Sequence, residues 1–240
     1  MLGQFDGLPN LDRLESLRLG LGNNRNEKQI ISFTKNPLEN SNLLGELFTA
    51  ISQKQVIELH YHVFSKPDED LKINLNPYLL KEYNRRWYLF AEAEKGSKLL
   101  NFSLDRIDKC IPLPSHKYKK YEGNINDWFD DIIGVTVLDN SPVYKIKLWV
   151  SDVSKDYVMT KPLHDSQRKL PMDEAQTLRN KFPFLKGGIF LRIDCKRNYE
   201  LIRELTSFGE NILVLEPKDI QDEIFEKISM INNKYQKIRT

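Results

Sequence analysis

The chain contains 240 residues, 40% of them hydrophobic, and its formal net charge at pH 7 is +2. This length is enough for one large domain or two small ones, each with a hydrophobic core. The near balance of charge excludes nucleic-acid binding through overall charge alone, so such a partner would need a local basic patch.

Neither a membrane segment nor a disulfide framework is expected. The sequence has no run of about 18 apolar residues, and its first residues lack the basic and apolar stretches of a secretory signal. The two cysteines, Cys110 and Cys195, are far apart and form no Cys-x-x-Cys motif. We therefore predict a cytoplasmic protein with reduced cysteines and no membrane contact.

Residues 1–38 are interpreted as an N-terminal linker with a helical segment. Leucines at three- and four-residue spacing predict a short helix over residues 10–21, and a short extended run follows at residues 29–34. A second helix is expected to begin at Asn40 or Ser41. Its apolar positions are Leu43, Leu44, Leu47, Phe48 and Ile51.

Residues 39–115 show the alternation of antiparallel strands. Apolar and polar residues alternate from Val56 to Phe64 and again from Leu71 to Leu75, before Pro77 interrupts the pattern. Two apolar runs, 87–93 and 99–104, flank a turn that contains Gly96, which predicts a β-hairpin. Four or five short strands in close succession predict a small, strongly bent β-barrel.

The first strand of this hairpin presents two different faces. Trp87, Leu89 and Ala91 share one face, and we assign Trp87 to the core. The opposite face carries Arg86, Tyr88 and Phe90. Because neither face is purely polar, the strand is expected to contribute to a binding surface.

Residues 116–139 are interpreted as a linker, since they are rich in polar residues and follow two prolines. Residues 140–240 then predict the order βαββαβ, which is the split-βαβ arrangement of ferredoxin-like domains. The expected elements are strands at 143–150, 163–170, 188–195 and 212–215, with helices at 152–159 and 199–208. Asn198 is expected to cap the second helix. The C-terminal helix begins at Pro217 and carries one apolar stripe of isoleucines and a tyrosine.

The motif Arg85-Arg86-Trp87-Tyr88-Leu89, followed by Leu104-Asp-Arg-Ile107, resembles the WYL domain family. The resemblance extends over roughly residues 42–110 and includes Ile57-Glu-Leu-His-Tyr61 and Asn76-Pro-Tyr-Leu-Leu80. It implies an Sm-like (SH3-like) β-barrel that senses an effector or binds single-stranded nucleic acid in bacterial transcription regulators. The βαββαβ region resembles the C-terminal extension that commonly follows this domain.

Members of that family bind their operator through an N-terminal helix-turn-helix. Only a linker-like segment at residues 5–14 precedes the barrel helix in this sequence. We therefore expect no selection among duplex DNA sequences by this chain alone.

Three residues are the leading candidates for a ligand site. Arg86 and Arg106 could bind phosphate bidentately, and the ring of Tyr88 could stack on a base. Further candidates are Tyr61, Lys81 and Ser103. The alternative interpretation is that the arginines form surface ion pairs with Glu82 or Asp105 and that Tyr88 is an ordinary barrel tyrosine.

Metal binding and catalysis are not expected, and no cofactor is predicted. His60 and His62 share the polar face of one strand, but no third ligand has a suitable spacing. His164-Asp-Ser-Gln167 contains the residue types of a catalytic triad, yet neighbouring side chains on a strand point to opposite faces.

The sequence thus predicts an α+β, two-domain, non-enzymatic regulatory module. Its barrel would bind a nucleotide or single-stranded nucleic acid, and its ferredoxin-like domain would form a homodimer or complete the ligand site. The alternative is a stand-alone protein-interaction or dimerisation module with no nucleic-acid ligand.

Overall fold

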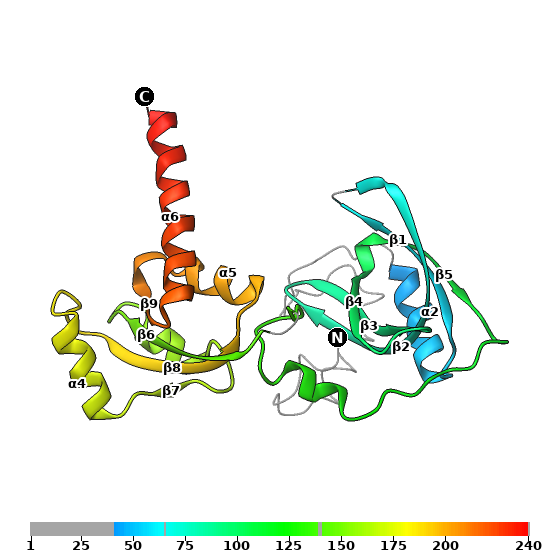
Figure 1. The fold of residues 1–240 in the computed structure, drawn as a ribbon, viewed down its shortest axis with the longest axis horizontal. Coiled ribbons are helices and arrows are strands. Elements are labelled where there is room, and N and C mark those ends of the chain that lie inside the picture. Colours follow the sequence, from blue (N-terminus) through cyan, green and yellow to red (C-terminus); the bar gives the residue numbers. More distant parts are fainter. Residues whose placement is uncertain (1–40, 65, 139–140, 240) are drawn as a thin grey trace, which may run out of the picture. The chain divides into compact units, whose positions relative to one another are not determined.

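The computed structural model describes residues 41–64, 66–138 and 141–239 (Figure 1). The helix predicted at 10–21 and the extended run predicted at 29–34 lie outside these described residues. The two antiparallel sheets that follow are described one at a time below. None of the helices within the described residues is long and apolar enough to cross a membrane.

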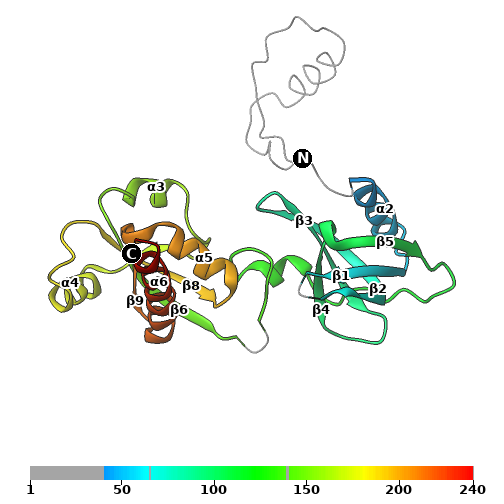
Figure 2. The ribbon, with the colours of Figure 1, turned by 90° about the horizontal axis from the view of Figure 1, so that it is seen from above.

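The first sheet is preceded by helix α2 (Ser41–Ser52), as the leucine spacing predicts. Leu43, Leu47 and Ala50 are buried because they recur on one face of the helix. This face packs against β2 (Lys66–Tyr83) and β5 (Ile107–Pro112), as Figure 2 shows for β5.

The first sheet contains five strands in the order β4-β3-β2-β1-β5, and every pairing is antiparallel. The remaining strands are β1 (Ile57–Val63), β3 (Arg86–Ala93) and β4 (Leu99–Ser103). Within the described residues the edge strands β4 and β5 do not pair with each other, so the sheet does not close into the predicted barrel.

Strand β2 runs through Pro77 instead of stopping there. Its pairing with β3 shifts between Pro77 and Leu79, which is the irregularity expected at a residue without a backbone N–H. Pro77 thus interrupts the alternation, as predicted, and it does so through a register shift within one continuous strand.

The two faces of the first sheet are covered differently. Ile57, Leu59 and Leu89 are fully buried in the core that α2 covers, and Trp87 is half-buried against this core. On the other face, Phe90 packs with side chains from the segment 121–135. Part of the predicted linker therefore forms a second layer over the sheet.

The second sheet also contains only antiparallel pairs, in the order β7-β8-β6-β9. Its strands are β6 (Val143–Val150), β7 (Arg168–Lys169), β8 (Ile189–Lys196) and β9 (Ile212–Glu216). The helices are α3 (Lys155–Thr160), α4 (Met172–Lys181), α5 (Tyr199–Ser207) and α6 (Lys218–Arg239).

Side-chain alternation divides the core of this sheet into two layers. Ile146, Leu148 and Val150 of β6 point to the layer that α5 and α6 cover. Trp149 points to the opposite layer, where Leu178 of α4 packs. Helix α4 lies in the stretch 171–186, to which the sequence assigned no element.

Asn198 caps α5, as predicted. Its Oδ1 accepts a hydrogen bond from the backbone N–H of Leu201 at 2.8 Å, and its Nδ2 donates to the carbonyls of Ile133 and Thr136, each at 2.8 Å. This fully buried side chain therefore joins the start of α5 to the segment that precedes β6.

Candidate ligand-binding site

Three of the predicted site residues lie in one row across the first sheet. Lys81 of β2 pairs with Tyr88 of β3, and Tyr88 pairs with Ser103 of β4. Residues that are directly paired share a face of the sheet. These three candidates are therefore neighbours on the sheet, although Ser103 is buried.

A short 3-10 helix, η2 (Leu104–Arg106), then directs two charged side chains to different partners. Asp105 forms an ion pair with Arg86 at 3.1 Å and accepts a short hydrogen bond from the hydroxyl of Ser103. Arg86 is therefore neutralised by Asp105, which is the pairing that the alternative interpretation names. Arg106 follows the apolar run 99–104 in the sequence, and the helical turn determines the direction of its side chain.

Arg106 packs on aromatic rings. The carbon at the centre of its guanidinium lies 4.9 Å from the ring centre of Tyr61 and 5.2 Å from that of Phe64. Both distances suit a cation–π contact. Within the described part of the chain, Arg106 forms no ion pair with a carboxylate.

Tyr61 is the buried support of this arrangement. It is 5% exposed, and its ring meets that of Phe102 edge to face with 5.2 Å between the ring centres. Burial raises the pKa of the Tyr61 hydroxyl, and the positive charge of Arg106 opposes this effect. Tyr61 therefore positions Arg106 rather than offering its own ring to a ligand.

Lys81 and Tyr88 lie on the face that the chain itself covers. The ammonium of Lys81 is 4.2 Å from the ring centre of Phe129, and Phe129 packs edge to face on Phe90 at 5.0 Å. Burial raises the pKa of the Tyr88 hydroxyl. The structure thus separates the six predicted residues into the Arg106–Tyr61 contact, the Arg86–Asp105–Ser103 cluster and the covered pair Lys81 and Tyr88.

Known families match both of these sheets. The WYL domain family matches residues 42–111, and the WCX domain family matches residues 142–230. The chain carries a WYL domain followed by a WCX domain. Segment 112–141 lies between the two matches, and the predicted domain boundaries stay predictions.

Solved structures show more distant likeness. One is the proteasome accessory factor B/C (PafBC) of Arthrobacter aurescens, with 16% identity, a TM-score of 0.32, and coverage of 81% of this chain and 27% of that chain. Another is described as a CRISPR Cas-related protein, with 13% identity, a TM-score of 0.48, and coverage of 82% and 53%. The chain thus spans about a quarter and about half of their lengths. No curated protein sequence matches it significantly.

Two residues of the WYL site were missed from the sequence. Phe64 is 62% exposed although it carries a large ring, and it lies directly after β1. Phe129 comes from the predicted linker. The predicted alternation ended at Phe64 and gave this residue no role, because β1 stops one residue earlier, and Phe129 lies in a segment without periodicity.

The histidines of the WYL domain pair with carboxylates. His60 Nε2 lies 2.8 Å from Glu58, and His62 Nδ1 lies 3.0 Å from Asp108. The part of the chain that the structure describes contains no group of three or more potential metal-binding side chains.

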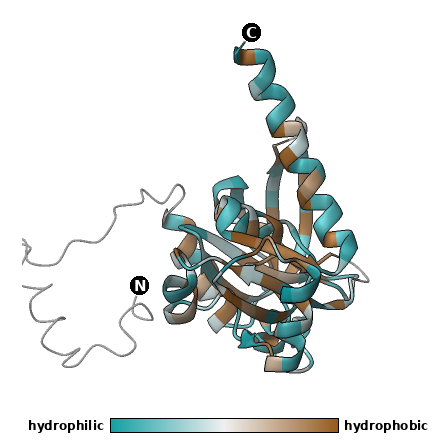
Figure 3. Ribbon diagram, turned by 90° about the vertical axis from the view of Figure 1, so that its left-hand side faces the viewer, coloured by the Kyte–Doolittle hydropathy of each residue, from teal (hydrophilic) through white to brown (hydrophobic). Residues whose placement is uncertain are grey.

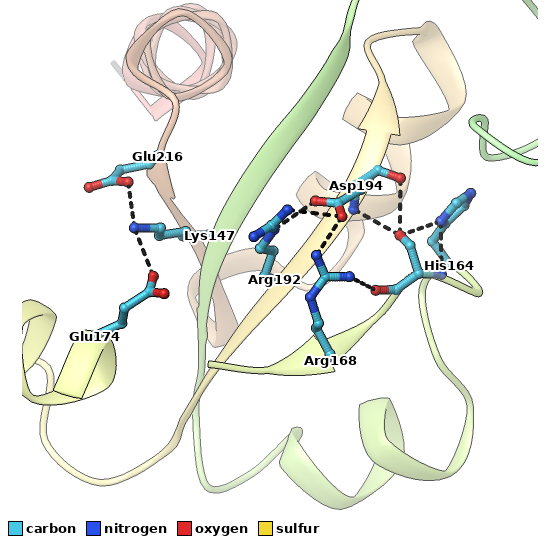
Figure 4. A network of polar contacts seen from close by, with 8 residues as sticks. Lys147, His164, Arg168, Glu174, Arg192, Asp194 and Glu216 are labelled. Carbon is cyan, nitrogen blue, oxygen red and sulfur yellow. Dashed lines mark hydrogen bonds and ion pairs between the residues drawn. The ribbon is translucent and has the colours of Figure 1, made fainter. Parts of the chain in front are cut away.

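The WCX domain contains a network of charges on one surface of its sheet (Figure 4). Asp194 accepts hydrogen bonds from Arg192 at 2.7 and 3.1 Å and from Arg168 at 2.6 Å. These bonds hold the pKa of the Asp194 carboxyl below its usual range. Lys147 lies between Glu174 at 3.2 Å and Glu216 at 3.1 Å. Both arginines and Lys147 are thus engaged within the domain.

The segment 163–167 does not form part of the strand predicted at 163–170. The segment forms a turn in which His164 Nδ1 lies 2.7 Å from Ser166 Oγ. That hydroxyl also accepts a bond from the Asp194 N–H at 2.8 Å and lies 3.0 Å from its carbonyl oxygen. The turn brings the two side chains together, and their contacts join it to β8.

Proposed function

We propose that this chain is the ligand-sensing part of a WYL-type bacterial transcription regulator, and that its WYL domain binds a nucleotide or single-stranded nucleic acid beside Arg106. The observation that carries the proposal is the packing of Arg106 on Tyr61 and Phe64 without a carboxylate partner in the described residues. As a transcription regulator, the protein would act in the cytoplasm.

The geometry suits an anionic ligand for two reasons. A guanidinium that is held by ring faces keeps its N–H groups available at its edge, where a phosphate can accept two parallel bonds. The contact with Tyr61 also limits the rotamers of Arg106 before binding, so less entropy is lost when a ligand binds.

Phe64 provides the second part of the proposed site. Its ring is 62% exposed and lies beside the Arg106 guanidinium. An exposed ring next to a phosphate-binding group is the combination by which proteins hold single-stranded nucleic acids, because bases stack on the ring. We therefore assign base stacking to Phe64 in place of the predicted Tyr88, which lies on the covered face of the sheet.

The other cations have smaller roles in this proposal. Arg86 is already paired with Asp105, and Lys81 is held against Phe129. A ligand could recruit Arg86 only by competing with the carboxylate of Asp105. Arg106 is therefore the principal contact, and Arg86 is an auxiliary one.

We also infer a ferredoxin-like fold for the WCX domain, while an Sm-like fold for the open WYL sheet is what the family resemblance implies. The strand order β9-β6-β8-β7 with only antiparallel pairs supports the first inference, since the split-βαβ connectivity produces this order. The very short β7 and the additional helix α4 are the departures. We assign no catalytic step to the chain, because the Ser166 hydroxyl is engaged by the backbone of Asp194.

The experiment is a fluorescence anisotropy titration with a labelled single-stranded oligonucleotide, repeated with the same sequence as a duplex and with free nucleotides as competitors. The proposal expects saturable binding of the single strand at low salt and no preference among duplex sequences. A sequence-specific duplex footprint would contradict it.

One observation favours the alternative of a protein-interaction module. Arg86 is paired with Asp105 and Lys81 is held against the ring of Phe129, so neither cation can bind a phosphate without leaving its present contact. Absence of any oligonucleotide or nucleotide binding at low salt would favour this alternative.

A further inference from the structure

We propose that the WYL domain has a second ligand site, for a small zwitterion of the amino-acid type, in a cavity on the covered face of its sheet. The cavity lies between the β3–β4 hairpin and the segment 119–128, and it is called the hairpin cavity below. Its volume is about 430 Å³, which is in the range of small-molecule sites. The residues that line it include Glu92, Lys98, Leu99, Lys119, Tyr121 and Trp128.

The hairpin cavity is separate from the site proposed at Arg106. Tyr61, on which Arg106 packs, belongs to the core that α2 covers. Leu99 and Trp128 belong to the cluster on the opposite face of the sheet. Ligand binding in the cavity therefore does not depend on the function proposed above, and each can be tested without the other.

One residue that lines the cavity is a buried carboxylate. Figure 3 shows that the strands are rich in apolar residues, but Glu92, near the end of β3, is only 5% exposed. Its direct neighbours across the sheet are Asn76 of β2 and Leu99 of β4. Glutamates are rarely buried unless they are paired, so the contacts of Glu92 indicate what it can still bind.

Only one oxygen of Glu92 is used within the domain. Its Oε2 accepts a hydrogen bond from the ammonium of Lys119 at 2.8 Å, and the hydroxyl of Tyr78 lies 3.3 Å from the same oxygen. Among the described residues, none donates a hydrogen bond to Oε1. A buried charged oxygen gains most from a charged donor, so Oε1 suits the N–H groups of an ammonium ligand.

A buried donor belongs to the same cavity. The side-chain N–H of Trp128 is buried and has no acceptor within the part of the chain that the structure describes. Native proteins satisfy nearly all such groups with a partner. A ligand carboxylate can accept this hydrogen bond once the indole ring turns slightly towards the cavity.

The charges around the cavity favour a ligand that carries both signs. Glu92 and Glu122 are its acidic lining residues, and Lys98 and Lys119 are its basic ones. These formal charges sum to zero, so a zwitterion leaves no unbalanced charge, whereas a ligand with a net charge does. We assign the ligand ammonium to Oε1 of Glu92 and the ligand carboxylate to the N–H of Trp128.

The walls of the cavity are apolar in part and are already in place. The rings of Tyr121 and Trp128 favour a ligand with an aromatic side chain. The backbone N–H of Lys119 donates to Oδ1 of Asn76 at 2.8 Å, and its carbonyl accepts a hydrogen bond from the Tyr78 hydroxyl at 3.0 Å. Because these bonds hold the segment on β2, less ordering is needed when a ligand binds.

The first test is isothermal titration calorimetry of the full chain with L-phenylalanine, L-tyrosine and L-tryptophan. We expect saturable binding of at least one of them. Analogues that lack one charged group then test the zwitterion. For phenylalanine these are phenethylamine, which lacks the carboxylate, and phenylpropionate, which lacks the ammonium. Each analogue should bind about tenfold more weakly or worse, the scale of a hydrogen bond to a charged group.

Variants assign the two contacts. Glu92→Gln removes the charge and keeps the shape, so we expect the amino acid to bind about tenfold more weakly or worse. The matched control is Glu94→Gln, which removes the same charge from the same hairpin, where it contacts Asn74 and His116. Trp128→Phe should weaken binding of the amino acid and leave that of phenethylamine unchanged. Thermal unfolding of each ligand-free variant verifies that it remains folded.

Four results would overturn the proposal. The first is no binding of any of the three amino acids at millimolar concentration. The second is equal affinity of folded Glu92→Gln and Glu94→Gln. The third, measured on the wild type alone, is an analogue that binds as tightly as the amino acid. The fourth is an Arg106→Ala variant that no longer binds the amino acid, because the two sites would then not be separate. Oligonucleotide binding without amino-acid binding would reject this inference and leave the proposed function standing.

Discussion

The guanidinium of Arg106 packs on the ring of Tyr61 at 4.9 Å, while Asp105, one residue earlier, pairs with Arg86. Asp105 and Arg106 are neighbours in η2, but their side chains have different partners: Asp105 contacts Arg86, and Arg106 contacts Tyr61. The contact fixes the position of Arg106 without neutralising it, because a ring face provides no formal negative charge.

Arg106→Ala should weaken binding of a single-stranded oligonucleotide by about 1.5–3 kcal/mol, or roughly 10- to 150-fold, the scale of hydrogen bonds to a charged group. The loss of unfolding free energy should stay below about 2 kcal/mol, since only cation–π contacts are removed. Anisotropy titration and chemical denaturation of the same variant measure both quantities. A large loss of stability with unchanged affinity of the folded fraction would instead identify Arg106 as a structural residue.

Asp105→Asn should strengthen binding of the same oligonucleotide. The substitution removes a carboxylate that competes for Arg86, while the amide oxygen can still accept the bond from Ser103. The expected gain is about 0.5–1 kcal/mol, the scale of an exposed ion pair. Asp108→Asn, next to His62, is the matched control and should have little effect. Weaker binding by Asp105→Asn would show that Arg86 needs Asp105 to hold it in position.

Asn198→Ala should strongly destabilise the WCX domain. The substitution removes the cap of α5 and leaves two carbonyls without their donor, so we expect a loss of about 2–4 kcal/mol of unfolding free energy. Thermal or urea denaturation measures the effect, with Asn233→Ala on the exposed face of α6 as control. Equal stabilities of the two variants would contradict the assigned role.

Both cysteines should react slowly with iodoacetamide in the folded protein. Burial raises the pKa of the Cys110 and Cys195 thiols to about 11. A raised thiol pKa keeps the protonated form, so the reactive thiolate is scarce near neutral pH and increases about tenfold per pH unit until the pH reaches that pKa. Alkylation followed by mass spectrometry, with urea-unfolded protein as reference, tests this. Fast modification of Cys195 at neutral pH would show that the β8 core opens readily.

Local patterns predicted the regular elements of this chain well. Strand alternation correctly separated Trp87 and Leu89 from Tyr88 and Phe90, and the capping rule correctly placed Asn198 at the start of α5. These features depend on residues close together in the sequence. Residue type and spacing are sufficient to recognise them.

Features that depend on distant contacts were missed. The sequence does not indicate that Phe129 packs on Phe90, because the segment around it has no periodicity. The turn at residues 163–167 was assigned to a strand, although the side chain of Gln167 satisfies the backbone of Leu163 and Val158 there. The edges of the first sheet likewise could not be determined from alternation, since closure depends on tertiary packing.

Only some of the predicted site residues lie next to one another in the structure. Pairing across β2, β3 and β4 places Lys81, Tyr88 and Ser103 in one row, as a hairpin prediction allows. Which arginine is neutralised depends on the η2 turn, and a single 3-10 turn leaves no clear pattern in the sequence. The ligand-binding role of these residues stays a prediction.

The most direct test of the central claim is the salt dependence of oligonucleotide binding by the wild type and Arg106→Ala. Phosphate contacts release counterions, so the logarithm of the affinity should fall linearly with that of the salt concentration, by about 0.7 per contacted phosphate of a single strand. The account predicts a clear slope for the wild type and a slope smaller by about one contact for Arg106→Ala. Wild-type affinity that does not change with salt, or equal slopes for the two proteins, would contradict phosphate binding by Arg106.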